Sequence, residues 1–149
     1  MNNLHVQKVR EYAKKEQAPL VTICAKLEED VAGLSSAEEK EYLESYGIKE
    51  KGLNALIRIS FATLGLITFY TAGEKEVRAW TVHKGALAPE AAGKIHTDIQ
   101  KGFIRAEVIS YNDFVTCGGR TRAKEAGKSR IEGKTYTVQD DDIILFFHN

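Results

Sequence analysis

The hydrophobic and polar positions of this 149-residue chain follow two different periods, and the change falls near residue 65. Before that point apolar residues recur every three or four positions, a spacing that is typical of amphipathic helices. Asn2 or Asn3 suits the N-cap of the first helix, and Ser35-Ser36 suits the cap of the second, with Glu38 and Glu39 placed favourably in its first turn. We expect the third helix to bury its apolar stripe. The helices are predicted at residues 4–17, 37–46 and 52–64.

A continuous apolar run at residues 20–25 follows Pro19 and predicts a strand buried on both faces of a parallel sheet. Its neighbouring strands are missing, so residues 1–65 are interpreted as the remnant of a larger α/β domain. An unpaired apolar edge of this kind favours self-association. Cys24, Ala25 and Lys26 would lie at the carboxyl end of the strand, where ligands bind in open α/β sheets. A contact with a nucleotide base and a strand that simply ends in a loop are both compatible with this position.

After residue 65 the apolar residues alternate, which predicts strands. A hairpin is expected over residues 67–82, with its turn at residues 72–75, and a short helix at residues 89–96. Three strands follow, at residues 104–109, 135–138 and 143–147. The order hairpin, helix, strand, strand, strand is that of a β-grasp (ubiquitin-like) domain. The predicted fold class is therefore α+β, with a β-grasp unit at residues 66–149 after the α/β remnant.

Composition and charge exclude several classes of protein. The 21 basic and 21 acidic side chains cancel, which argues against binding of nucleic acid by bulk charge alone. Two cysteines cannot form a disulfide framework, and four scattered histidines show no metal-ligand spacing, so no metal site is expected. The longest apolar stretch is too short to span a membrane, and no membrane partner is expected.

One segment departs from this balance, because residues 120–134 hold six basic side chains against two acidic ones. Basic side chains gathered in this way can contact the phosphates of RNA. A solvated surface that balances the acidic remainder of the chain explains the same composition. Four glycines at residues 118–133 predict that much of the segment is flexible. The six basic residues are Arg120, Arg122, Lys124, Lys128, Arg130 and Lys134.

Two triplets imitate a phosphate-binding loop, at residues 127–129 (GKS) and 133–135 (GKT). The full motif needs a glycine five residues before the Gly-Lys pair, so that backbone N–H groups can surround the phosphates. Arg122 and Lys128 occupy those positions, so neither triplet qualifies. No catalytic residue is identified, and the chain by itself is expected to be inactive.

Longer strings of sequence resemble the TGS domain of the YchF/Obg-like ATPases and the closing part of their nucleotide-binding domain. The most specific are FYTAGEKEVRAWT at residues 69–81 and KGFIRAEVI at residues 101–109. Upstream, CAK at residues 24–26 and GLNALIR at residues 52–58 resemble the nucleotide-binding domain. The resemblance covers essentially the whole chain.

This resemblance implies a TGS domain of β-grasp fold at residues 66–149, preceded at residues 1–65 by a truncated remnant of a P-loop nucleotide-binding domain. It implies a cytoplasmic ATPase that associates with the ribosome and uses ATP and magnesium in the full-length parent. Cys24, Ala25 and Lys26 match the motif that lies against the nucleotide base. The phosphate loop and magnesium-binding residues of the family are absent, so no cofactor is expected in this chain.

The leading hypothesis is that the TGS domain binds ribosomal RNA or protein through the basic segment. An alternative is that it regulates or docks on the missing N-terminal ATPase domain without binding RNA. A structural appendage with no ligand of its own is the third option. The sequence leaves the choice of RNA or protein as ligand open.

Overall fold

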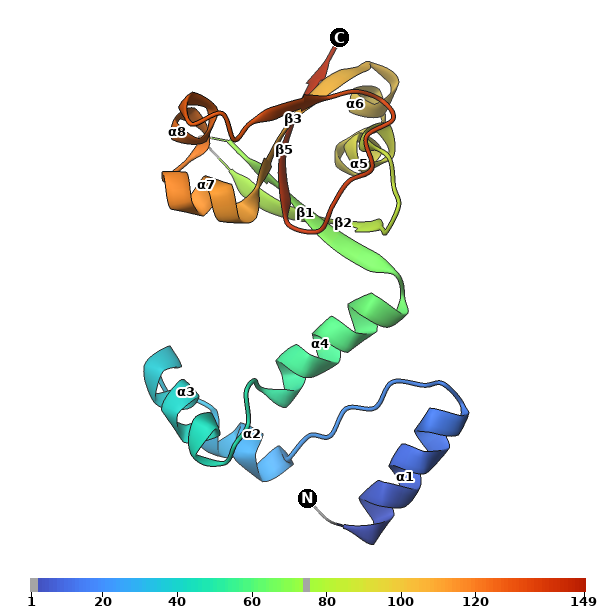
Figure 1. The fold of residues 1–149 in the computed structure, drawn as a ribbon, viewed down its shortest axis with the longest axis vertical. Helices are drawn as coiled ribbons and strands as arrows, with labels where there is room; N and C mark the ends of the chain where they lie inside the picture. Colours follow the sequence, from blue (N-terminus) through green and yellow to red (C-terminus); the bar gives the residue numbers. More distant parts are fainter. Residues whose placement is uncertain (1–2, 74–75) are drawn as a thin grey trace. The chain divides into compact units, whose positions relative to one another are not determined.

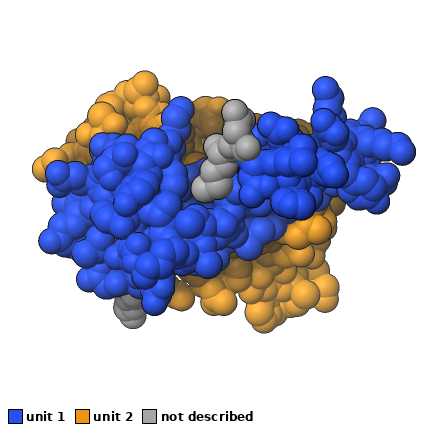
Figure 2. Space-filling model, turned by 90° about the horizontal axis from the view of Figure 1, so that it is seen from below, with its two compact units in different colours: residues 1–63 blue, residues 64–149 orange. Residues whose placement is uncertain are grey.

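The computed structural model describes residues 3–73 and 76–149, and the expected turn of the hairpin lies partly outside them. The chain divides into two compact units, residues 1–63 (unit 1) and residues 64–149 (unit 2), which Figure 2 colours separately. The break expected near residue 65 is close to this division. Unit 1 contains four helices, and its described residues form no strand (Figure 1). These helices are α1 (Leu4–Lys15), α2 (Ala25–Val31), α3 (Ser36–Ser45) and α4 (Gly52–Thr63).

Local signals set the ends of the helices in unit 1. The Asn3 side chain accepts a hydrogen bond from the His5 N–H at 2.8 Å and caps α1, as one of the two candidates predicted. Ser35 and Glu38 form a reciprocal capping box at the start of α3. Gly52 opens α4, and its N–H donates to Glu28 Oε1 at 2.6 Å. A Cβ on Gly52 would lie only 2.8 Å from the Ile23 side chain, so a larger residue would break this close approach.

The strand predicted at residues 20–25 is wrong. Residues 18–24 have no regular secondary structure, and Ala25 begins α2. A strand buried on both faces needs a neighbour on each side to satisfy its backbone, and the described part of unit 1 offers no such neighbour. The Leu20 and Ile23 side chains accordingly remain exposed.

The helix predicted at residues 52–64 is confirmed as α4, but its predicted burial is wrong. No residue of α4 is buried, and the side chains of Leu53, Leu56 and Ile57 are each more than two-fifths exposed. The apolar stripe therefore exists as the sequence predicts, but nothing within unit 1 covers it.

Unit 2 is an α+β unit built on a mixed five-stranded sheet of order β2-β1-β5-β3-β4. The central contact joins β1 and β5 in parallel, with Phe69 opposite Asp142 and Tyr70 opposite Ile143. All other neighbouring pairs are antiparallel. Its strands are β1 (Leu66–Ala72), β2 (Val77–His83), β3 (Phe103–Ser110), β4 (Arg130–Glu132) and β5 (Asp142–His148), and its helices are α5 (Ala88–Ile95), α6 (Thr97–Lys101), α7 (Tyr111–Cys117) and α8 (Arg120–Glu125).

The sheet is covered by helices on both faces. In Figure 1, α5 and α6 lie on one side of it, and α7 and α8 on the other. The main core lies on the α5 side, where Phe69 and Ile144 from the sheet pack against Ala91 and Ala92 of α5. Alternation along the strands sends Tyr70 and Leu145 to the opposite side, toward α7.

Two predictions for the late part of unit 2 need correction. Residues 135–138 form no strand; only Thr137 makes an isolated bridge, with Leu87, while Val138 is buried in the core. β3 pairs with β5 on one side, and on its other side it pairs with β4, which lies upstream of residues 135–138. The segment expected to be flexible holds regular structure instead, namely α8 and β4. Its first glycines form a turn: Gly118 and Gly119 adopt the positive φ angles of 75° and 120°, which let the chain turn sharply from α7 into α8.

Candidate functional site

The basic segment does not form one uniform surface, because two of its residues are bound to a buried carboxylate. Glu107 of β3 has a side chain that is only 5% exposed. Arg120 Nη1 lies 3.2 Å from Glu107 Oε1, and Lys124 Nζ lies 3.8 Å from Glu107 Oε2. Both partners come from α8, so this ion-pair cluster holds the helix to the sheet.

Arg120 is used mainly inside the domain. Its side chain is 22% exposed, and Nη2 also donates to the Ala72 carbonyl at 3.4 Å. It thereby connects β3, through Glu107, with the end of β1. The prediction that Arg120 contacts RNA is therefore the least favoured of the six, since any phosphate would compete with a desolvated carboxylate.

Lys128 and Arg130 are exposed, and each interacts with one neighbouring side chain. Lys128 Nζ lies 3.6 Å from Asp113 Oδ1. The hydrogen bond from Ser110, assisted by the Lys128 ammonium, lowers the pKa of Asp113 below its ordinary value. Arg130 Nη2 donates to the Tyr136 hydroxyl at 3.4 Å, and its guanidinium lies 5.8 Å from the centroid of that ring.

The Tyr136 hydroxyl in turn donates to the buried Asp142 carboxylate at 2.6 Å. Burial and this hydrogen bond raise the pKa of Tyr136 well above its ordinary value, so the phenol stays neutral. Arg122 and Lys134 are exposed. The accessible cations of the segment are therefore Arg122, Lys124, Lys128, Arg130 and Lys134, which we call the cation surface.

The predicted nucleotide contacts lie in unit 1. Cys24 is the half-buried N-cap residue of α2, and Ala25 and Lys26 form the first turn of that helix. The Lys26 ammonium lies 2.9 Å from Asp30 Oδ1 and 3.2 Å from Glu29 Oε2. The ammonium donates to both carboxylates, and these hydrogen bonds, the one to Asp30 first, raise the pKa of Lys26. The predicted place at the end of a strand is wrong, because residues 3–24, the described part of the chain before α2, form no strand. The contact with a base stays a prediction.

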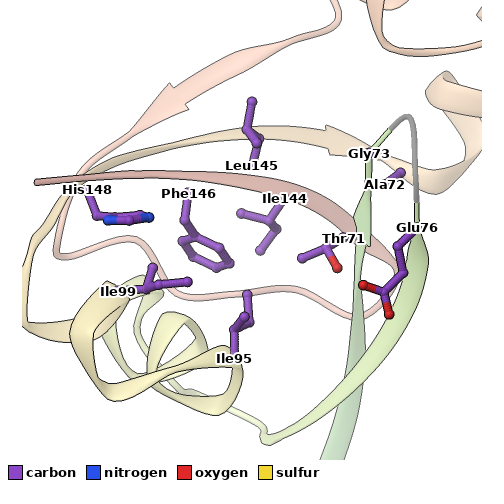
Figure 3. A pocket seen from close by; sticks show the side chains of 10 residues that line it. All are labelled: Thr71, Ala72, Gly73, Glu76, Ile95, Ile99, Ile144, Leu145, Phe146 and His148. Carbon is purple, nitrogen blue, oxygen red and sulfur yellow. The ribbon is translucent and has the colours of Figure 1, made fainter.

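The sequence reasoning missed two cavities, one on each side of β5. The first has a volume of about 510 Å³ and lies on the α5 side. Figure 3 shows Ile95 and Ile99 pointing toward Ile144 and Phe146 of β5, while Leu145 points away from them. The second, which we call the α7 cavity, has a volume of about 620 Å³. Alternation in β1 and β5 places Tyr70 and Leu145 on its side, but α7 itself was not predicted.

The described residues offer neither a membrane-spanning helix nor a cluster of metal-binding side chains. None of the helices formed by residues 3–73 and 76–149 is both long and apolar enough to cross a membrane. Within the same ranges, no three His, Cys, Asp or Glu side chains gather where they could hold a metal ion.

Comparison with known proteins gave a consistent set of relatives. Residues 66–149 match the family YchF-GTPase_C, described as a protein of unknown function (DUF933). The chain is 53% identical over 147 residues to a protein of Bacillus subtilis named ribosome-binding ATPase YchF, covering 99% of this chain and 40% of that protein. It is 55% identical over 148 residues to the protein of the same name from Haemophilus influenzae, covering 99% of this chain and 41% of the relative.

Solved structures gave the same result. The YchF GTPase of Schizosaccharomyces pombe superposes with a TM-score of 0.81 at 31% identity, over 97% of this chain and 39% of that one. A GTP-binding protein from Pyrococcus horikoshii superposes with a TM-score of 0.64 at 19% identity, over 96% of this chain and 41% of that one, and supports the fold alone. The chain thus spans about two-fifths of the length of the relatives that it matches.

Proposed function

Because this chain belongs to the YchF family and corresponds to the C-terminal portion of its members, we propose that unit 2 is the module through which a YchF-type ATPase contacts ribosomal RNA. The proposal combines two supports. Relatives that share more than half of their aligned residues with this chain are named ribosome-binding ATPases. The cation surface supplies the positive charge that an RNA backbone attracts.

We further propose that unit 2 is a TGS domain of the β-grasp fold. The support is its strand order, β2-β1-β5-β3-β4, with a parallel central pair and helix α5 packed across one face. Helices α7 and α8 are inserted between β3 and β4 of the sheet. The cation surface lies on α8, on β4 and on the loops that adjoin them.

Unit 1 is proposed to be part of the nucleotide-binding domain of a cytoplasmic ATPase that uses ATP with magnesium. The exposed stripe of Leu53, Leu56 and Ile57 supports this, because an amphipathic helix is stable when its apolar face packs on other elements. Cys24, Ala25 and Lys26 would then lie near the nucleotide base. The 149-residue chain alone is expected to hydrolyse no ATP, since its two Gly-Lys triplets lack the surrounding loop.

The observation that carries the RNA proposal is the exposure of the cation surface, so the test reverses its charge. The variant replaces three residues that are free of the Glu107 cluster: Arg122→Glu, Lys128→Glu and Lys134→Glu. A matched control makes the same change in charge at exposed lysines of the α5–α6 side: Lys84→Glu, Lys94→Glu and Lys101→Glu. Co-sedimentation of the chain with ribosomes is measured for both over a range of salt concentrations.

We expect the first variant to bind at least about tenfold more weakly, and its plot of log affinity against log salt to flatten by about 2 units as three phosphate contacts are lost. The control should retain most of its binding and its salt slope. Equal loss in both variants would show that only net charge matters. Unchanged binding by the first variant would remove the cation surface from the proposal and favour docking on the ATPase domain instead.

A further inference from the structure

The α7 cavity is a large hollow on the face of the sheet opposite the main core of unit 2. It is lined by residues of β1, β5, α7 and α8 and by the first residue of β2. Tyr70, Tyr111 and Phe114 supply aromatic surface, and Val77 and Leu145 supply aliphatic surface. A volume of about 620 Å³ falls within the range of small-molecule sites.

The aromatic side chains of the cavity are accessible. The Tyr70 and Tyr111 rings have centroids 6.1 Å apart and are tilted by 41°, so they do not close the space by stacking on each other. Tyr111 is 48% exposed and Val77 is 73% exposed. Apolar surface gathered and exposed in this way is unfavourable in water, and it is typical of a surface that binds a partner.

Charged side chains of both signs lie around the cavity. Near Tyr70 lie the carboxylates of Asp140 and Asp141; burial, and then Asp141, raise the pKa of Tyr70. Arg120 lines the cavity, and it shares the Glu107 carboxylate with Lys124 of the same helix. Two cations face one buried anion there, so one positive charge remains in excess, on a Lys124 side chain that is 69% exposed.

We propose that the α7 cavity binds one unpaired nucleotide of an RNA, with its base against Tyr111 and its phosphate toward Lys124. The proposal rests on the proposed function, because it names the feature of the RNA that unit 2 would recognise. It extends the contact beyond the phosphate backbone to a base that is not paired in a duplex.

The chemistry of the cavity favours a nucleotide over an apolar peptide. A base has flat faces that stack on tyrosine, and its amino groups can donate to the carboxylates near Tyr70. The phosphate attached to the same nucleotide is attracted to the excess positive charge on Lys124. An apolar side chain would use the aromatic surface alone and would gain nothing from these charges.

The experiment measures binding of a short single-stranded RNA to the 149-residue chain by fluorescence anisotropy, for wild type, Tyr111→Ala and Tyr111→Phe. Tyr12→Ala, at an exposed tyrosine of α1, is the matched control. A second strand carries an abasic site in place of one base, and a fully paired duplex is a third probe. Amide chemical shifts of residues 70, 111, 114 and 145 locate the bound strand and show that each variant is folded.

We expect Tyr111→Ala to weaken binding of the single strand by about 5- to 100-fold, the range expected for loss of one base–aromatic stack. The slope with salt should stay unchanged, since no cation is removed. Tyr111→Phe and Tyr12→Ala should bind as wild type does. The abasic strand and the duplex should bind more weakly than the intact single strand.

The outcomes separate this proposal from the function on which it rests. If the single strand binds through the cation surface but Tyr111→Ala and the abasic strand behave as wild type and intact RNA do, the cavity proposal is overturned and the proposed function stands. If Tyr111→Ala weakens pelleting with ribosomes but leaves RNA binding unchanged, a ribosomal protein occupies the cavity, which also overturns it. If wild type binds neither RNA nor ribosomes, both proposals fail.

Discussion

Units 1 and 2 contain similar kinds of side chain but bury them very differently. In unit 2, Phe69, Val108 and Ile144 are completely or almost completely removed from solvent within one continuous core. Among the described residues of unit 1, only Ala13, Val31 and Leu43 are buried, and they do not belong to that core. Apolar side chains on α1 and α4 of unit 1 are largely exposed instead.

The difference shows how far local signals can build a structure without tertiary packing. Caps and periodic patterns define α1, α3 and α4, because these signals act within a few residues. Burial requires partners from elsewhere in the chain, and the sheet of unit 2 provides them by pairing β1 with β5 across more than 60 residues. Most of the stability of a helix in a protein comes from such packing.

The largest predicted difference between the two units is in the free energy of unfolding that is lost when one apolar side chain is truncated in each. Phe69→Ala removes a fully buried ring from the centre of unit 2, and it should lower the free energy of unfolding by about 3–5 kcal/mol. Leu53→Ala removes a side chain that is 57% exposed on α4, and it should change that free energy by less than about 0.5 kcal/mol. Chemical denaturation of the 149-residue chain, followed through signals of each unit, measures both.

This prediction fails if Leu53→Ala costs as much as Phe69→Ala, since that result would mean that the stripe of α4 is buried in solution. A thermal shift of the Leu53→Ala variant that depends on protein concentration would point to the self-association predicted from the sequence.

The sequence was most informative where the responsible residues are neighbours. Ser35 and Glu38 predicted the start of α3, and alternation around Phe69 predicted the hairpin of β1 and β2. Residues 20–25 and 135–138 were wrongly assigned as strands, because β-propensity reports only that a segment fits a pleated surface. Whether a strand forms depends on a partner edge, and β3 is paired by residues 130–132 instead.

The same limit applies to the candidate site. Composition located the basic segment, but it could not show that Arg120 is held in an ion pair while Arg122 is exposed. The reason is that the partner of Arg120 is Glu107, which lies on another element. The α7 cavity was missed for a related reason: Tyr70 and Tyr111 meet only through the folding of β1 against α7. A buried carboxylate in an alternating strand, as Glu107 is in β3, resembles an ordinary solvent-facing position in the sequence.

An intermediate effect on the free energy of unfolding is predicted for the ion-pair cluster of Glu107, Arg120 and Lys124 in unit 2. Arg120→Ala leaves the Glu107 carboxylate buried with only the more distant Lys124, and it should lower the free energy of unfolding by about 3 kcal/mol. Glu107→Ala should cost a similar amount, and the double variant should cost less than the sum. Denaturation of the three variants completes the cycle.

The control for this cycle is Glu125→Ala, which removes an exposed carboxylate from the same helix α8. Its effect should stay within about 0.5 kcal/mol. Additive losses in the double variant would contradict a direct interaction of Arg120 with Glu107. They would also return Arg120 to the accessible cations of the basic segment.

The smallest predicted effect tests whether unit 1 depends on local signals, through the capping box of α3. Ser35 Oγ donates to Glu38 Oε2 at 2.6 Å, and this bond, followed by that from the Ser35 N–H, lowers the pKa of Glu38 below its ordinary value of 4.5. Ser35→Ala should weaken the helix start by about 1 kcal/mol. Carbon chemical shifts of residues 36–39 measure this change.

The pH dependence follows from the direction of that shift. A carboxyl group whose pKa is lower in the folded state stabilises the fold above its unfolded pKa, and the stabilisation is lost as the pH falls through the folded value. The helical shifts of α3 should therefore decline below about pH 4.5 in wild type. In Ser35→Ala the pKa of Glu38 should rise toward its ordinary value, but not fully, because the backbone N–H still donates to it.

Ser45→Ala, which removes a hydroxyl bonded to the Tyr42 carbonyl at the other end of α3, should leave the titration of Glu38 unchanged. If Ser35→Ala also lowers the stability of unit 2, the two units are coupled, and unit 1 is more than a set of locally specified helices.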